Sequence, residues 1–323
     1  MARFLLRLFW QSFLLFFLSF TLIFFILRIL GDPAQMLLGQ RSDQASLEAI
    51  RAALHLDKPL WQQYLYAWLD WLPYEKGRWQ VPSLGVSYQY GKPVLQLYLE
   101  RLPATLILSS AALGLALVLG VFGGLYQAHR PSQLLSYVSL FLLSMPSYVL
   151  GLILIGVFVI ALGEWTNLPL LGYIKVYEVQ SETFRYQWEA LLMPALALAL
   201  RPAAYLFQLT STQAHIILRQ DYIRAAYARG KKPLSILFKD VLRNIFPVIT
   251  TALTQWIAGL FTGALFVEEL FDWPGIGKLL FSALMTSDFP VVMGIAQLSA
   301  LLFVLLHAGS EILARWSDPR LRE

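Results

Sequence analysis

The chain has 323 residues, of which 58% are hydrophobic and only 14% are charged, with a formal net charge of +5. A soluble domain usually has about 45–50% apolar and about 25% charged residues, so this composition predicts a membrane protein. The absence of cysteine excludes disulfides, zinc thiolate sites and cysteine nucleophiles. The positive charge comes without a polybasic tail or an aromatic-interleaved basic surface, which argues against nucleic-acid binding and favours membrane topology as its cause.

Six apolar blocks are long enough to cross a bilayer, because a helix needs about 20 largely apolar residues to cross a hydrocarbon core of about 30 Å. The predicted spans are residues 8–30, 104–126, 134–162, 190–210, 245–267 and 290–312. The sequence therefore predicts an all-α polytopic membrane protein, a single bundle with six transmembrane helices.

The first span differs from a cleavable signal peptide. Its apolar run from Leu8 to Leu27 is longer than the usual h-region of about 7–15 residues, and no small-x-small cleavage site precedes Gly31-Asp32-Pro33. Residues 1–30 are therefore predicted to be an uncleaved N-terminal anchor helix.

Basic residues in the short loops predict the orientation in the membrane, because loops rich in Lys and Arg stay cytoplasmic. The loop between the fourth and fifth spans contains Arg219, Arg224, Arg229, Lys231, Lys232, Lys239 and Arg243. Acidic residues predominate in the loops 163–189 and 268–289. Both termini are therefore predicted to be cytoplasmic, as an even number of spans requires.

The long segment 31–103 then lies outside the cytoplasm. Its many Trp and Tyr residues favour the water–lipid interface. Two interpretations remain open, namely partly helical structure that lies on the membrane, or a small folded extracytoplasmic subdomain. Residues 104–312 form the core membrane domain, with a cytoplasmic loop at 213–244, and residues 313–323 form a cytoplasmic tail.

The most specific pattern lies in the cytoplasmic loop. Residues 221–229 favour a helix, Gly230 can end it in a left-handed conformation, and Lys231-Lys232-Pro233 turns the chain. A second short helix over about 233–243 then leads into the next span. Small Ala225 and Ala226 would let the surface of another protein approach closely, although a solvated helix–turn–helix loop explains the same pattern.

Ala225, Ala226 and Gly230, followed by Leu242-Arg243-Asn244 and Pro247, resemble the EAA loop of permease subunits of bacterial ATP-binding-cassette (ABC) importers. Arg224 stands where the general pattern has Glu, and Asp240 where His is frequent. Further motifs narrow the resemblance to the dipeptide/oligopeptide/nickel permease family, and within it to the first permease subunit, which has a long extracytoplasmic loop. These motifs are Gly31-Asp32-Pro33-Ala34, Leu56-Asp57-Lys58-Pro59-Leu60, Arg101-Leu102-Pro103-Ala104-Thr105, Ser144-Met145-Pro146, Glu268-Glu269-Leu270-Phe271-Asp272-Trp273-Pro274-Gly275-Ile276-Gly277, Asp288-Phe289-Pro290 and Asp318-Pro319-Arg320.

This resemblance implies a type I ABC importer transmembrane domain, with 104–312 as the core permease domain, in the bacterial inner membrane. The implied coupling helix, which docks in a groove on a cytoplasmic ATPase, would carry Asp221, Arg224, Ala225, Ala226, Arg229 and Gly230. The implied partners are a second homologous permease subunit, two ATPase subunits, an extracytoplasmic solute-binding protein and membrane lipid. ATP and Mg would be bound by the ATPase subunits, so no cofactor and no catalytic residue is expected in this chain.

Five residues in the predicted spans are candidates for a pore or gate. Met145-Pro146 should kink the third span, because proline removes a backbone hydrogen bond. Arg201 is a clear charge inside a span, where insertion costs about 2.5–3.5 kcal/mol. It could line a pore and meet peptide carboxylates, or it could snorkel or pair with the partner subunit. Thr254 and Gln255 could line a polar path or bond to neighbouring helices.

Two glycine patterns have structural interpretations. The segment 275–278, Gly-Ile-Gly-Lys, suggests a phosphate loop, but Asp272 stands where that motif has its first glycine and Leu279 where it has Ser or Thr. A turn holding a short helix is predicted instead. The pairs Gly120/Gly124 and Gly259/Gly263 have the small-xxx-small spacing of closely approaching helices.

The resemblance implies import of di- or oligopeptides, with nickel or metallophore chelates or glutathione as alternatives, and some relatives are exporters. A self-contained channel or proton-coupled secondary transporter is the alternative class. It predicts carboxylates well inside the spans, whereas Glu268, Glu269 and Glu311 lie near span ends. The four histidines are not at metal-ligand spacing, so no metal site is predicted.

Overall fold

The computed structural model describes residues 2–29, 48, 51, 56–71, 74–75, 78–79, 84–166, 168–169, 172–173, 175–178 and 183–317. The chain forms two compact units, one of residues 1–103 and 279–305 and the other of residues 104–278 and 306–323. It passes from one unit to the other inside three helices, which are α5 (Val94–Leu117), α14 (Ile276–Met285) and α15 (Phe289–Ser317).

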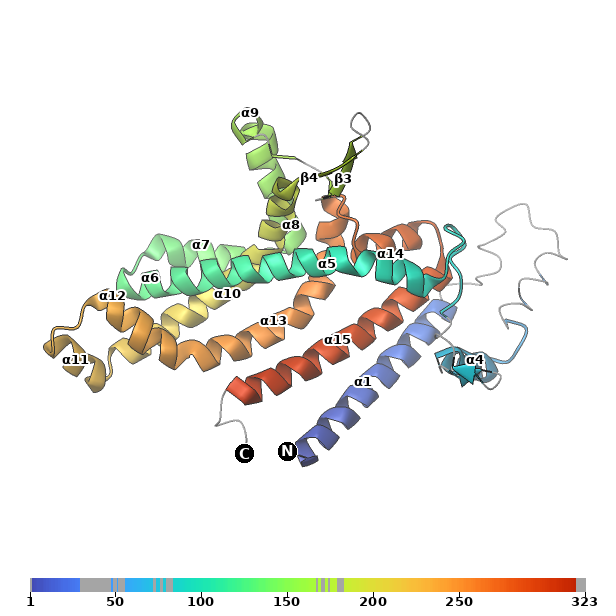
Figure 1. Ribbon diagram of the computed structural model, residues 1–323, viewed down its shortest axis with the longest axis horizontal. Coiled ribbons are helices and arrows are strands. Elements are labelled where there is room, and N and C mark those ends of the chain that lie inside the picture. The colour runs from blue at the N-terminus through green and yellow to red at the C-terminus, as the bar shows by residue number, and fades with distance from the viewer. Residues whose placement is uncertain are drawn as a thin grey trace. The chain divides into compact units, whose positions relative to one another are not determined.

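In the first unit, aromatic side chains hold the amphipathic helix α4 (Leu60–Trp71) against α1 (Ala2–Ile29), near the C-terminal end of α1 (Figure 1). The ring centroids of Phe20 and Trp68 are 4.1 Å apart, and Phe20 is fully buried. The hydroxyls of Thr21 and Tyr64 are 2.7 Å apart. The indole of Trp71 donates a 2.8 Å hydrogen bond to Gln297 of α15. A short antiparallel pair, β1 (Tyr74–Glu75) and β2 (Arg78–Trp79), follows.

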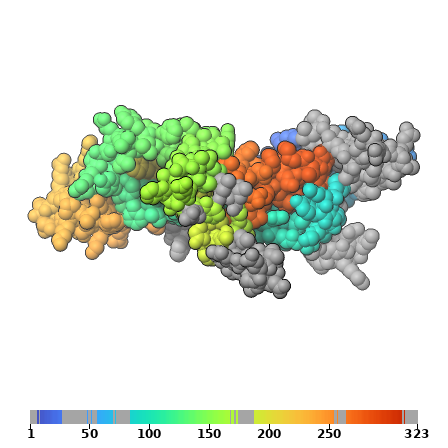
Figure 2. Space-filling model, turned by 90° about the horizontal axis from the view of Figure 1, so that it is seen from above, coloured from blue at the N-terminus to red at the C-terminus, as the bar shows by residue number. Residues whose placement is uncertain are grey.

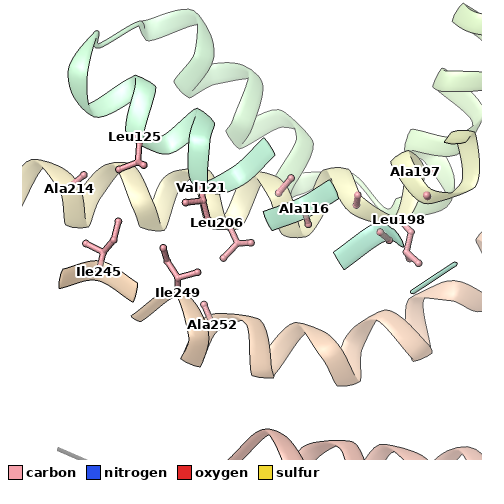
Figure 3. Close-up of a cluster of buried hydrophobic side chains, with 14 of the residues drawn as sticks. Ala116, Val121, Leu125, Ala197, Leu198, Leu206, Ala214, Ile245, Ile249 and Ala252 are labelled. Carbon is pink, nitrogen blue, oxygen red and sulfur yellow. The ribbon is translucent and has the colours of Figure 1, made fainter. Parts of the chain in front are cut away.

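The second unit is built around α10 (Leu192–Leu218), which packs against η2 (Val118–Phe122), α6 (Gly123–His129), α7 (Gln133–Ser144), α8 (Ser147–Leu154) and α13 (Leu242–Leu270). Figure 3 shows Val121 of η2 and Leu125 of α6 on one side of α10, with Ile249 of α13 on the other side. Many buried residues of α10 are alanines, which lets neighbouring backbones come close.

Gly120 and Gly124 are the closest points of this packing. A Cβ added at Gly124 would lie 2.7 Å from the carbonyl oxygen of Phe207, and one at Gly120 would lie 2.5 Å from Cβ of Leu206. Side chains cannot occupy these positions without displacing α10, which confirms close helix packing at this pair. The corresponding contacts of Gly259 and Gly263 lie outside the described residues.

The predicted spans agree with the observed helices in four places. By length and composition, Phe9–Ile26, Val94–His129, Trp188–Leu218 and Phe289–Gly309 could each cross a membrane. The predicted span 245–267 lies within α13, a helix of 29 residues. At about 1.5 Å per residue this helix is about 44 Å long, enough for a bilayer.

The third predicted span, 134–162, is broken rather than kinked. Met145 and Pro146 are both extended, and the chain bends by 116° between α7 and the helix 147–161. Two effects explain the break, because proline lacks an amide hydrogen and also pushes the preceding residue out of the helical region. Neither half is long enough to cross a bilayer alone, so this pair forms a broken span or a re-entrant loop.

Short elements connect the long helices. After α8 come η3 (Ile155–Ala161), a π-helical segment, and α9 (Gly163–Thr166). The antiparallel strands β3 (Lys175–Glu178) and β4 (Thr183–Tyr186) and the turn η4 (Trp188–Leu191) lead into α10. The bundle is helical as predicted, and the two hairpins are small additions to it. Between α10 and α13 lie α11 (Asp221–Ala228), α12 (Pro233–Ser235) and η5 (Ile236–Val241).

Replacing Gly124 by Ala tests the close packing. We expect the free energy of unfolding to fall by about 2 kcal/mol, because the added methyl group collides with backbone of α10. Gly114→Ala is the matched control, since a Cβ there meets nothing within 4 Å. Denaturant titration of the purified proteins in detergent measures both, and equal stability of the two variants would contradict the packing.

Candidate functional site

The helix α11 lies at one end of the second unit, beyond the ends of α10 and α13 (Figure 1), and is part of the gold surface beside the green α6 and α7 in Figure 2. It starts after Gln220, whose ψ of 148° is extended. Beyond its last residue, Ala228, the chain turns at Gly230, whose φ is +75°. The amides of Gly230 and Lys231 donate to the carbonyls of Tyr227 and Ala226 at 2.9 and 3.2 Å. This is a Schellman cap, and its left-handed residue favours glycine.

The two faces of α11 have different environments. Ile223 and Ala226 are buried, in the same hydrophobic cluster as residues of η5. Ala225 and Arg229 are exposed, and exposed Arg224 pairs with Asp221 at 3.3 Å. The predicted site residues therefore lie together on α11 and its C-terminal cap, and all but one of them are exposed.

The exception is Ala226, which is only 3% exposed. Its side chain packs inside the chain, because its small volume lets α11 approach η5. The prediction that Ala225 and Ala226 together leave room for another protein is therefore wrong for Ala226, and the exposed face offers Ala225 alone of the pair.

The pore and gate candidates belong to other elements. Met145 and Pro146 form the corner between α7 and α8. Arg201 is exposed in the N-terminal half of α10, which runs through Pro202 without a break. The side chains of Thr254 and Gln255 lie outside the described residues.

A second polar site, centred on Glu268, was not predicted from the sequence. Glu268 lies near the end of α13 and is completely buried. One carboxylate oxygen accepts a 2.7 Å hydrogen bond from the hydroxyl of Thr105, and the other accepts from the amides of Gly277 and Lys278 at 2.7 and 3.2 Å. The hydroxyl of Thr105 in turn accepts from the amide of Ile276 at 2.8 Å. The site therefore joins α5, α13 and the first turn of α14.

The carboxyl group of Glu268 explains why the sequence at 275–278 resembles a phosphate-binding loop. Amides at a helix N-terminus are a usual binding place for phosphate and carboxyl oxygens, and here they bind the carboxyl group of Glu268 in the same chain. A Cβ at Gly275 would lie 2.2 Å from Oε1 of Glu268, so glycine is needed at that position to admit the carboxylate. The predicted turn holding a short helix is present, since α14 starts at Ile276.

Trp273 packs in the same turn between α13 and α14. Its side chain is fully buried, and its indole donates a 2.9 Å hydrogen bond to the carbonyl of Ala104. Asp272 has a left-handed φ of +55° at the end of α13, and its carboxylate pairs with Lys278. The two carboxylates of this turn thus bond to side chains and amides of their own chain and give it a fixed shape.

The fold is that of a type I ABC importer transmembrane domain. A structure titled as inward-facing conformations of the MetNI methionine ABC transporter superposes with a TM-score of 0.50 at 17% sequence identity, covering 69% of this chain and 97% of that one. At this identity the similarity establishes the fold alone.

Sequence comparison identifies the family. Residues 116–323 match the binding-protein-dependent transport system inner membrane component, and residues 1–109 match the N-terminal part of such a membrane component. The chain therefore belongs to this family of permease subunits, and it is a multi-pass inner-membrane protein.

Curated relatives match over nearly the whole chain. The di/tripeptide transport system permease protein DppB of Pseudomonas aeruginosa is 34% identical, with 93% of each chain covered. The oligopeptide transport system permease protein AppB of Bacillus subtilis is 32% identical, with 90% of each chain covered. Members of this family are inner-membrane components of binding-protein-dependent transport systems.

Replacing Glu268 by Ala tests the buried carboxylate site. We expect the free energy of unfolding to fall by about 3 kcal/mol, because two amides and a hydroxyl would remain buried without their acceptor. Glu269→Ala is the matched control, as the neighbouring residue is only partly buried. Denaturant titration compares the two, and equal losses would show that the hydrogen bonds of Glu268 contribute nothing specific.

Proposed function

We propose that this chain forms one half of a translocation pore, paired with a second homologous permease subunit, and that α11 is the coupling helix that docks on an ATPase subunit. Both termini and residues 213–244 then face the cytoplasm, and residues 31–103 face the opposite side. ATP and Mg bind to the ATPase subunits only. The single observation that carries the proposal is the exposed face of α11, built around Ala225.

Three features of α11 support docking. The helix lies at one end of its unit, a glycine cap fixes where it ends, and its buried face holds it against η5. Its exposed face offers a small residue between Arg224 and Arg229. A small side chain permits close approach of a partner backbone, and the arginines can pair with acidic groups at the rim of the contact.

Energy coupling follows from differential binding. ATP can change the state of the pore only if the ATPase subunits bind α11 differently in the inward-open and outward-open states. A helix that keeps its shape as it moves can meet this requirement, because its position against the ATPase subunits then differs between the two states. The corner at Met145 and Pro146 adds a place where the helix pair 133–161 can change its angle during the same transition.

Peptides are the proposed cargo. The relatives that match over the whole chain are named as permeases for dipeptides, di/tripeptides or oligopeptides. We place Arg201 on the translocation path, where a guanidinium can bind the terminal carboxylate of a peptide. Specificity in such a system depends mainly on the binding protein that delivers the cargo.

Ala225→Trp tests the docking of α11. The indole should block the approach of the ATPase, so that the ATPase subunits no longer copurify with the permease and ATP-driven uptake is lost. The substituted side chain points away from the core, so folding should not change. Ala161→Trp, the same enlargement at an exposed alanine of η3, is the control. Normal copurification and uptake by the Ala225 variant would refute docking at this face.

Arg201→Gln tests the contact with the cargo carboxylate. We expect uptake of a dipeptide with a free C-terminus to fall about tenfold, since a charge-assisted hydrogen bond is lost. Uptake of the C-terminally amidated dipeptide, which lacks the carboxylate, should change little. Competition assays in proteoliposomes compare the two peptides, and equal losses for both would exclude a direct contact.

A further inference from the structure

Polar contacts attach both ends of α11 to the segment that leads into α13. At the C-terminal end, the ammonium group of Lys231 lies 2.8 and 2.6 Å from the two carboxylate oxygens of Asp240 in η5. At the N-terminal end, the amide of Asn244 donates to the hydroxyl of Tyr222 at 3.3 Å. The same Asn244 amide donates to the carbonyl of Asp240 at 2.6 Å. Tyr222, Lys231, Asp240 and Asn244 are therefore connected, with the link between Asn244 and Asp240 made through the backbone carbonyl of Asp240.

The contacts matter for geometry more than for stability. Lys231 and Asp240 are both partly exposed, with side chains 38% and 25% accessible, and such pairs contribute little to the free energy of unfolding. However, α11 has only eight residues, too few for an isolated helix to be stable in water. Its position therefore depends on its neighbours α10 and η5, and the contacts toward η5 and α13 are made by the buried Ile223 and Ala226 and by the two polar ends.

The chain carries any movement of α11 onward to α13. From Pro233 to Leu270 the helix is continuous, passing through α12, η5 and α13. The segment η5 is π-helical, a wide turn that is frequent at functional positions. Toward α10, α11 is joined by the short link at Arg219 and Gln220, and it packs against both α10 and η5. The polar contacts of Lys231 with Asp240 and of Tyr222 with Asn244 add a direct connection from α11 to η5 and the start of α13.

We propose that Tyr222, Lys231, Asp240 and Asn244 form a clamp that makes α11 and the start of α13 move as one body. These are positioning residues, which transmit the displacement of the docked helix into the membrane without touching ATP or cargo. The inference depends on the docking proposed for α11. Without the clamp, α11 would still bind the ATPase. The turn 229–232 would then bend, and little of the displacement of α11 would reach α13.

Charge exchange tests the clamp in the complete reconstituted transporter. Lys231→Asp and Asp240→Lys should each lower the solute transported per ATP hydrolysed by about tenfold, while the ATPase subunits still copurify and hydrolyse ATP. The double variant K231D/D240K, in which the charges are exchanged, should restore the ratio to within about twofold of the original, because a new pair forms. Tyr222→Phe should lower the ratio in the same direction.

Lys232→Asp is the matched control, since it makes the same charge change one residue away at an exposed position. It should leave the ratio of transport to hydrolysis unchanged. A simple folding defect would lower transport and hydrolysis together and leave the ratio constant. Such a parallel loss in the single variants, or failure of the double variant to restore the ratio, would overturn the clamp.

Failure of the clamp is distinguishable from failure of the docking proposal. If Ala225→Trp abolishes copurification but the exchanged pair does not restore the ratio, α11 docks and the clamp is wrong. If Ala225→Trp leaves copurification and uptake intact, the docking proposal is wrong, and the clamp falls with it.

Discussion

The architecture depends on one constraint, which is that a backbone amide or carbonyl in a membrane must find its partner inside the protein. Long helices satisfy it along their length, so the difficult positions are where helices end or break. In the described part of this chain, such positions carry specific solutions. The carboxyl group of Glu268 accepts from amides in the first turn of α14, and Pro146 has no amide hydrogen to satisfy.

The Glu268 site shows how a carboxylate can be structural in a transporter. A completely buried carboxyl group is costly unless it is hydrogen-bonded, and here three donors surround that of Glu268. The contacts fix one end of α13 against α5 and α14. At the other end of α13, η5 and its polar contacts with α11 lie where the ATPase is proposed to dock. The helix is thus held at both ends, which suits an element that transmits movement.

Close packing around α10 gives the second unit its stiffness. Glycine at 120 and 124 and a series of alanines bring the backbones of α6 and α10 together, where dispersion contacts rather than a hydrophobic driving force stabilise helix association. By contrast, α11 is short, exposed and attached through a few contacts. Coupling requires a docked helix that the ATPase can displace and packed helices stiff enough to carry that displacement into the membrane.

The sequence by itself determined the membrane class, most of the spans and the family, because long apolar blocks, charge asymmetry and contiguous motifs are local properties. It also located α11 and its glycine cap. Only the tertiary structure decided that Ala226 faces inward while Ala225 faces outward, and that Glu268 occupies the anion-binding turn at 275–278. Each of these depends on which residues distant in the chain come into contact, and neither periodicity nor composition contains that information.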